Sequence, residues 1–289
     1  MNTETSTTAR ALDRYAVLGN PVEHSQSPFI HAEFVRQTGQ AMEYGRLLAP
    51  LDGFAETVRA FAAGGARGCN VTVPFKFDAF HLAPRHTERA ALAQAANALR
   101  FDADGWLADN TDGAGLIRDI ETGAGVSLAG QRVLLIGAGG AAAGVLGPLL
   151  AAGPAEVVVA NRTLGNAQTL VERHRGAAGR VALRACPAVD CGAAYGVVIN
   201  ASASSLQGAA VPVADAVIAP GALAIDLMYG TAAQGFLNWA TGLGAQGRDG
   251  LGMLVEQAAG AFELWRGVRP ETAPVLAALA QRLAEAGKR

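Results

Sequence analysis

A lysine closes the segment GCNVTVPFK (68–76), which has the composition of a β-strand that ends at Pro74. Lysine and arginine together number 23 in this chain, but only Lys76 and Lys288 are lysines. A lysine can release its proton in a folded protein, whereas an arginine stays protonated. A residue that donates a proton in one direction of a reaction and accepts it in the other must be able to release it, so Lys76 is a candidate acid–base residue. Asn70 and Thr72 are two residues apart on the same strand, and their side chains therefore share one face.

Two serines and an aspartate form a second set of candidates. Ser25 and Ser27 lie in HSQSP (24–28), where Pro28 suits the first position of a helix and Ser27 its N-cap. Ser25 is not needed as a cap, and two hydroxyl groups beside the positive end of a helix can bind a carboxylate. Asp112 in DNTDG (109–113) precedes another helical run. Taken alone, both sets fit helix capping as well as ligand binding.

A glycine-rich turn stands between an apolar strand and a helix in VLLIGAGGAAAG (133–144). Gly137, Gly139 and Gly140 let the backbone turn sharply and approach a pyrophosphate, whose charge would sit on free N–H groups at the helix N-terminus. A further strand, EVVVA, follows about 20 residues later, as in dinucleotide-binding units. The alternative is a tight turn without a ligand.

The end of that further strand indicates which dinucleotide would bind. Enzymes that use NAD usually place an acid there, whereas an arginine suits the 2′-phosphate of NADP. This chain has Asn161, Arg162 and Thr163 and no acid. NADP is therefore the expected cofactor, with a solvated surface arginine as the alternative.

Alternating strands and helices would position all of these residues, which predicts an α/β fold with mostly parallel sheets. The first series has strands at 15–19, 43–48 and 68–73, helices at 28–38 and 52–63, and a hairpin around DADG (102–105). A second series begins at Gln131, with strands at 132–137, 156–161, 181–185, 196–201 and 222–229. The segment 252–288 is predicted to be helical, and the crossover at 112–130 is the expected boundary between two domains.

Composition narrows the class of protein. The chain has 289 residues, of which 51% are hydrophobic and 17% charged, with a net charge of −2. No basic cluster is present, so nucleic acid and anionic membranes are not expected as partners. The uncharged segment 133–155 contains six glycines and two prolines, which argues against a membrane helix.

The cysteines and the first residues indicate the compartment. The spacing of Cys69, Cys186 and Cys191 fits neither a zinc site nor a disulfide framework. We therefore expect no metal site, and we expect the protein to be in the reducing cytoplasm. The first ten residues are polar, unlike a secretory signal. The oligomeric state, monomer or homodimer, stays open.

Seven ordered motifs together resemble the shikimate dehydrogenase family. They are GNPVEHSQSP (19–28), NVTVPFK (70–76), AANAL (95–99), DNTDGAGL (109–116), IGAGGAA (136–142), NRT (161–163) and DGLGMLVEQAA (249–259). The resemblance implies reduction of 3-dehydroshikimate to shikimate with NADPH, a step of aromatic amino-acid biosynthesis. It also implies a substrate-binding and catalytic domain formed by 1–112 and 250–289, and a Rossmann-type NADP domain formed by 113–249. The final helices would return to the first domain.

The resemblance implies a role for each matching position. Lys76 and Asp112 match the catalytic pair. Substrate binding is implied for Ser25, Ser27 and Tyr229 near the carboxylate, and for Asn70, Thr72, Asn97 and Gln257 near the ring hydroxyls. Cofactor binding is implied for Gly137, Ala138, Gly139, Gly140, Ala141, Asn161, Arg162 and Thr163, with lesser positions at Glu88, Leu227 and Gly250.

Some positions depart from the family pattern and leave alternatives open. Asn166 replaces a frequent second basic residue, Ser202 a frequent threonine, and Ala98 a threonine after the asparagine. The nearest alternatives are a quinate or shikimate dehydrogenase paralogue that uses NAD; methylenetetrahydrofolate dehydrogenase and a nucleotide-binding sensor without turnover are more distant. Burial disfavours a charged lysine and a neighbouring carboxylate favours it, so the charge state of Lys76 also stays open.

Overall fold

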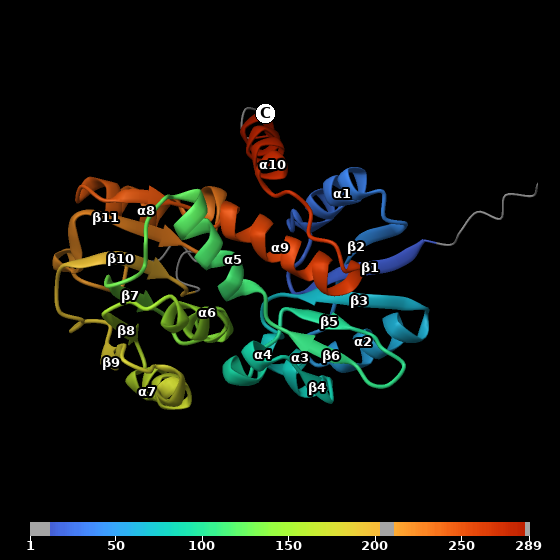
Figure 1. Cartoon of the computed structure of the whole chain (residues 1–289), viewed down its shortest axis with the longest axis horizontal. Helices are drawn as coiled ribbons and strands as arrows, with labels where there is room; N and C mark the ends of the chain where they lie inside the picture. Colours follow the sequence, from blue (N-terminus) through green and yellow to red (C-terminus); the bar gives the residue numbers. More distant parts are fainter. Residues whose placement is uncertain (1–11, 203–210, 287–289) are drawn as a thin grey trace, which may run out of the picture.

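The computed structural model describes residues 12–202 and 211–286, and its strands form two six-stranded sheets (Figure 1). The first sheet has the order β2-β1-β3-β5-β6-β4. Its strands are β1 Asp13–Gly19, β2 Met42–Leu48, β3 Ala66–Val71, β4 Arg85–His86, β5 Ala98–Arg100 and β6 Leu107–Asp109. Strands β2, β1 and β3 are parallel, while β5 and β6 form the predicted antiparallel hairpin. We call this sheet and the helices on it the first lobe.

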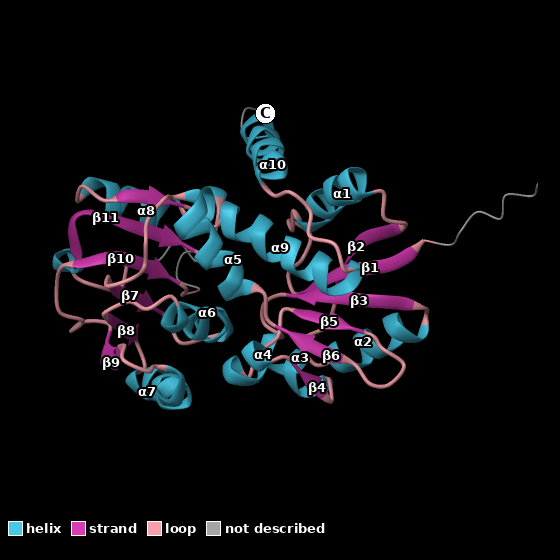
Figure 2. Ribbon diagram, viewed as in Figure 1, coloured by secondary structure: helices cyan, strands magenta, loops and turns pink. Residues whose placement is uncertain are grey.

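Helices cover both faces of the first sheet (Figure 2). On one face lie α2 Phe54–Ala63 and α3 Lys76–Leu82, whose apolar side chains pack on Leu18, Cys69 and Val71. On the other lie α1 Ser27–Thr38 and two helices from the C-terminal end, α9 Leu251–Arg266 and α10 Ala273–Ala286. The predicted helical segment 252–288 is thus two helices, because Gly267 adopts a left-handed backbone with a φ of 70° after α9.

The second sheet is entirely parallel, and its strands run β12-β11-β10-β7-β8-β9. If these strands are numbered 1 to 6 in chain order, the sheet reads 3-2-1-4-5-6 from the β9 edge, which is the order of dinucleotide-binding folds. The strands are β7 Arg132–Ile136, β8 Glu156–Asn161, β9 Ala182–Pro187, β10 Tyr195–Asn200, β11 Ile218–Asp226 and β12 Gln246–Arg248. The predicted α/β class is confirmed. The short strands β4 and β12 were not predicted.

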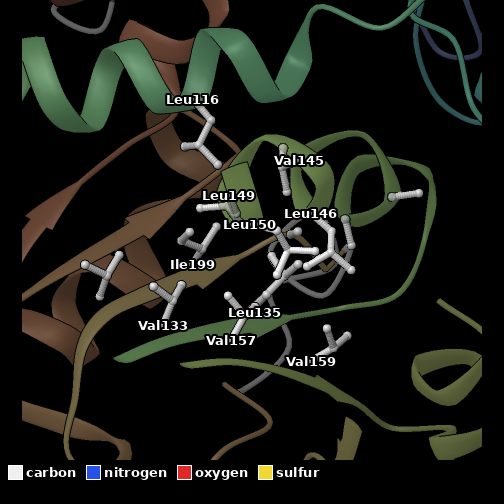
Figure 3. Close-up of a cluster of buried hydrophobic side chains, with 14 of the residues drawn as sticks. Leu116, Val133, Leu135, Val145, Leu146, Leu149, Leu150, Val157, Val159 and Ile199 are labelled. Atoms are coloured by element: carbon white, nitrogen blue, oxygen red, sulfur yellow. The ribbon is translucent and has the colours of Figure 1, made fainter. Parts of the chain in front are cut away.

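The second sheet is buried on both faces, which explains its continuous apolar runs. Helices α6 Gly140–Ala151 and α7 Leu164–His174 cover one face, with Leu135, Val157 and Ile199 beneath them (Figure 3). Helix α8 Gln234–Gly242 packs on the other. This sheet and its helices are the second lobe. The uncharged segment 133–155 forms β7, a turn and α6, and no helix within the described ranges is long and apolar enough to cross a membrane.

The chain passes between the lobes through two helices that lie side by side. Helix α5 Asp112–Arg118 continues as a π-helical turn, Asp119–Gly123, and α9 runs along it on the way back (Figure 1). The buried carboxylate of Asp119 accepts two hydrogen bonds from the guanidinium of Arg248. Gly252 gives it room, since a Cβ there would lie 1.8 Å from the carboxylate. The ion pair therefore joins the first crossing to β12, and the close packing at Gly252 joins it to α9.

Candidate active site

Lys76 is positioned by the turn that follows β3. The strand ends at Val71, and the Phe75 N–H donates to the carbonyl of Thr72 at 3.1 Å, so the chain reverses before α3 begins at Lys76. The buried ring of Phe75 stacks on Phe54 and anchors this turn. Lys76 Nζ donates to Asp112 Oδ2 at 2.6 Å, with only 14% of the lysine side chain exposed.

Asp112 is the first residue of α5, and Thr111 occupies the N-cap position before it. The capping alternative for this residue is therefore wrong. Its Oδ2 accepts from Lys76, and its Oδ1 accepts from Asn97 Nδ2 at 2.9 Å. Both oxygens are thus held, and the carboxylate fixes the direction of the lysine ammonium.

Asn97 joins the first lobe to the returning helix. Its Nδ2 donates to Gln257 Oε1 at 3.1 Å as well as to Asp112, and its Oδ1 accepts from the Thr111 N–H at 2.8 Å. Gln257 comes from α9 and donates its own Nε2 to the carbonyl of Leu254. The residue before β5, the start of α5 and helix α9 therefore form one hydrogen-bond network with the lysine–aspartate pair.

Tyr44 belongs to this constellation and was missed by the sequence analysis. Its hydroxyl donates to Asn70 Oδ1 at 2.7 Å, while Asn70 Nδ2 donates to the carbonyl of Asn97 at 3.0 Å. Burial raises the pKa of Tyr44 well above its usual value, so the phenol remains a hydrogen-bond donor. Its ring stacks on the imidazole of His31 at 4.0 Å between centroids. From the sequence, the hydrogen-bond partner of a tyrosine hydroxyl on a predicted strand cannot be identified.

The two serines lie together at the start of α1. The helix begins at Ser27, and Gln26 occupies the N-cap position without a side-chain cap, so the prediction that Ser27 is the N-cap is wrong. Ser25 Oγ lies 3.2 Å from Ser27 Oγ and accepts from the Ser27 N–H at 3.3 Å. Thr72 is half-buried, and its methyl group fills the space that a Cβ on Gly19 would need.

Tyr229 connects this region to the second lobe. It follows β11, and its ring packs against the apolar cluster that contains Ile30 and Phe34 of the first lobe. Burial raises the pKa of its phenol. The residue thus approaches the serine loop from the opposite lobe.

The glycine turn after β7 combines a tight backbone with open space. Gly137 has a φ of 112°, and a Cβ there would lie 2.9 Å from the carbonyl oxygen of Ala201. A Cβ on Gly139 would meet nothing within 4 Å, whereas one on Gly140 would lie 3.3 Å from Lys76 Cβ. Helix α6 has no side-chain cap, so the turn can offer its N–H groups to an anion beside Lys76.

The remaining cofactor candidates lie at the ends of strands of the second sheet, with one exception. Asn161 ends β8 and donates to the carbonyl of Thr163 at 2.9 Å, while Arg162 is exposed and forms no ion pair within the described residues. Leu227 and Gly250 meet after β11, where a Cβ on Gly250 would lie 2.4 Å from the Leu227 carbonyl oxygen. The exception is Glu88, which is exposed at the start of α4 Glu88–Ala93 in the first lobe.

The positions that depart from the family pattern are also placed. Asn166 is exposed on α7, Ala98 is buried in β5, and Ser202 Oγ donates to Asn200 Oδ1 at 2.7 Å. Residues 203–210, which follow Ser202, lie outside the described residues. In the described part of the chain no group of three or more potential ligands could hold a metal, and all three cysteines are free.

Comparisons with known proteins match nearly the whole chain. Three family models match it: "Shikimate dehydrogenase substrate binding domain" at residues 17–99, "Shikimate / quinate 5-dehydrogenase" at 120–209, and "Shikimate 5'-dehydrogenase C-terminal domain" at 250–280. The protein of Methylibium petroleiphilum named shikimate dehydrogenase (NADP(+)) is 65% identical over 279 residues, which cover 94% of this chain and 95% of that protein.

Solved structures agree in fold. An Ael1 enzyme from Pseudomonas putida is 46% identical with a TM-score of 0.84, and the match covers 92% of this chain and 98% of that one. Shikimate 5-dehydrogenase from Thermus thermophilus, in complex with NADP(H) and shikimate, is 30% identical with a TM-score of 0.79. That match covers 94% of this chain and 100% of the other.

Proposed function

The chain belongs to the shikimate dehydrogenase family, and from this premise we propose that its cleft reduces 3-dehydroshikimate to shikimate with NADPH. The reaction is a step of the shikimate pathway to aromatic amino acids. The observation that carries the proposal is the Lys76–Asp112 ion pair, which lies against the glycine turn at Gly140 and shares a hydrogen bond with Asn97. A proton donor and a dinucleotide-binding turn are thereby adjacent.

Lys76 supplies the proton in the proposed mechanism. Bound NADPH provides the hydride that reduces the ketone carbon. Negative charge then grows on the ketone oxygen, and Lys76 Nζ donates a proton to it and takes the proton back in the reverse direction. Asp112, whose Oδ2 lies 2.6 Å from Lys76 Nζ, orients the ammonium group. The low exposure of both side chains limits the access of competing water.

The substrate is held by neutral hydrogen-bonding groups on two sides. Ser25, Ser27 and Tyr229 face the carboxylate in this proposal. The ring hydroxyls are bound by Asn70, Thr72, Asn97 and Gln257, supported by the bonds that already connect three of them. Because protein partners orient the amides of Asn70 and Asn97, the directions of both side chains are fixed before the substrate arrives.

The residues present fit NADP. The open space at Gly139 and the uncapped start of α6 suit the pyrophosphate, which the Gly137–Ala141 turn would hold. Arg162, flanked by Asn161 and Thr163, suits the 2′-phosphate because its guanidinium is exposed and has no acidic partner in the described residues. Leu227 and Gly250 would line the cofactor side, and Glu88 is assigned there by the family pattern alone.

The proposed domains are 1–112 with 250–289 for substrate and catalysis, and 113–249 for NADP. Leu116 of α5 packs in the second lobe, whereas Val255 and Phe262 of α9 pack in the first, which supports this division. All proposed site residues come from one chain, so a monomer or a homodimer would have complete sites. The free thiols of all three cysteines fit the reducing cytoplasm.

One assay tests the function. Nicotinamide absorbance is followed with shikimate or quinate, each with NADP or NAD. We expect shikimate with NADP to give the highest kcat/KM, and Asp112→Asn, which keeps the shape of the side chain, to reduce it. No oxidation of shikimate with either cofactor would refute the proposal, and preferential oxidation of quinate with NAD would identify a quinate dehydrogenase instead.

A further inference from the structure

The proposed carboxylate subsite has a negative ligand and no assigned positive charge. Ser25 and Ser27 are neutral, and the ammonium of Lys76 is already paired with Asp112. Burying a carboxylate beside neutral groups alone is unfavourable, whereas a nearby cation stabilises it. The structure contains a cation at this place that the proposed function leaves unused.

Arg46 lies on the same face of the first sheet as the proposed substrate residue Asn70, and in register with it. The parallel register aligns Arg46 of β2 with Val17 of β1, and Val17 with Asn70 of β3. In-register residues of parallel strands share a face, so Arg46 stands about 10 Å from Asn70 across two strand spacings. Tyr44 is two residues earlier on the same strand and reaches Asn70 with its hydroxyl, which identifies the face.

The guanidinium of Arg46 binds the serine loop directly. Both its Nε, at 3.0 Å, and its Nη2 donate to the carbonyl oxygen of Ser25. Its positive charge also acts on Tyr229: burial raises the pKa of this phenol, while a hydrogen bond with the Gln26 backbone and the charge of Arg46 work in the opposite direction. Arg46 is thus close to both the serines and the tyrosine of the subsite.

The charge of Arg46 is not neutralised within the described residues. Most other arginines of the first lobe bind a carboxylate, as Arg36 binds Glu33 and Arg89 binds Asp109, but Arg46 forms no ion pair there. An arginine that is held by a carbonyl and lacks an acidic partner leaves its charge available to a ligand.

We propose that Arg46 is the positioning and specificity residue for the substrate carboxylate, holding Ser25 in place and supplying the positive charge that favours an acid over a neutral analogue. The inference rests on the proposed function, because the carboxylate belongs to the substrate. Arg46 does not contact the reacting ketone, so its loss affects binding of the acid more than the chemical step.

The test compares an acid with its neutral ester. Wild type, Arg46→Gln and Arg46→Lys are assayed with NADP and either shikimate or shikimate methyl ester, the ester serving as a competitive inhibitor if it is not oxidised. Arg59→Gln is the matched control, since Arg59 is an exposed arginine of α2 without an ion pair in the described part of the first lobe. It removes the same charge from the lobe at another place.

We expect Arg46→Gln to raise the KM for shikimate roughly tenfold, the usual size of one charge-assisted interaction, with kcat and the KM for NADP little changed. Binding of the ester should change little, so discrimination between acid and ester falls. Arg46→Lys should recover part of it, and Arg59→Gln should match wild type. Added salt should raise the KM of wild type more than that of Arg46→Gln.

Equal losses for acid and ester in Arg46→Gln would mean that Arg46 only holds the loop, and would overturn the inference while the proposed function stands. A wild type that does not oxidise shikimate would instead overturn the proposed function, and the inference with it. The two failures are therefore distinguished by the wild-type control.

Discussion

At the scale of single residues, the candidate site depends on side chains that are oriented by other side chains. Asp112 holds Lys76, Asn97 holds Asp112, and Gln257 from the other end of the chain holds Asn97. Such a chain of hydrogen bonds fixes directions within a few tenths of an ångström, which proton transfer requires. Arginine does not replace the lysine in this role, because lysine combines a positive charge with a proton that it can release.

Lys76→Arg tests that statement. The variant keeps a positive charge near Asp112 but cannot release a proton, so we expect kcat to fall about 100-fold or more while the KM for shikimate changes less. Steady-state rates from nicotinamide absorbance measure both constants. Lys288→Arg makes the same substitution at the chain's other lysine, to which the proposed mechanism gives no role, and should behave as wild type. Near-normal turnover in Lys76→Arg would mean that fixed charge is sufficient.

The sequence predicted the types of the candidate residues better than their partners. Lys76, Asp112 and the glycines could be identified because their chemistry is unusual for their positions. The partners of Ser27 and Tyr44 could not, since a hydroxyl's partner depends on how α1, β2 and β3 pack. The N-cap prediction for Ser27 was wrong because α1 starts at Ser27 itself, one residue before Pro28, and this leaves Gln26 as the N-cap.

At the scale of elements, the glycine turn after β7 serves two purposes through different glycines. The backbone conformation of the turn requires glycine at position 137, because its φ of 112° and the neighbouring Ala201 carbonyl leave no room for a side chain. Gly139 has ordinary backbone angles and empty space beside it. The first glycine is therefore required by the fold and the second by the proposed ligand.

Alanine at each position separates these purposes. We expect Gly137→Ala to lower the free energy of unfolding by about 1–3 kcal/mol, through strain and collision, and to weaken NADP binding as well. Gly139→Ala should keep the wild-type Tm but raise the KM for NADP, because its methyl group occupies the cradle. Thermal unfolding and the KM for NADP are measured for both. A Tm loss in Gly139→Ala equal to that in Gly137→Ala would contradict this division.

The elements that the sequence did not predict are short or depend on a single backbone conformation. β4 and β12 have two and three residues, too few for a hydrophobic period to be recognised. The break between α9 and α10 depends on the left-handed backbone of Gly267, whereas the composition of 252–288 is helical throughout. The long apolar strands of the second sheet were predicted well because burial on both faces dictates their residues.

At the scale of the whole molecule, buried and paired ionisable groups in both lobes couple stability to pH. Burial lowers the pKa of His31 to about 3, although the neighbouring Asn70 acts in the opposite direction. At Asp109, burial acts to raise the pKa, but Arg89 holds it below its usual value. At Glu156 in the second lobe, Arg184 and Arg132 likewise outweigh burial and lower the pKa.

The sign of the pH dependence follows from these pKa values. The unfolded chain protonates His31 below pH about 6.5, but the folded protein does so only near pH 3, so stability falls as the pH drops through this range, by up to about 1.4 kcal/mol per pH unit. Carboxylates with a lowered pKa stabilise the fold above about pH 4, and this contribution is lost below that pH.

His31→Phe should therefore flatten the free energy of unfolding between pH 6.5 and about 4.5, while the decline below about pH 4 remains. Urea unfolding at a series of pH values measures it. His24→Gln, at an exposed histidine of the same lobe, is the control and should follow wild type. The prediction fails if His31→Phe keeps the wild-type slope above pH 4.5.

The position of α9 in the chain has a consequence for biosynthesis. The face of the first sheet that carries Tyr15 and Met42 is covered in part by α9, whose residues are synthesised after the entire second lobe. At ribosomal speeds of about 5–20 residues per second, that face waits roughly 8 to 30 seconds between the end of β6 and the end of α9. The second lobe can fold during this interval, whereas the first lobe keeps an apolar surface open. The nascent chain is therefore most exposed to chaperones and to aggregation at its oldest part.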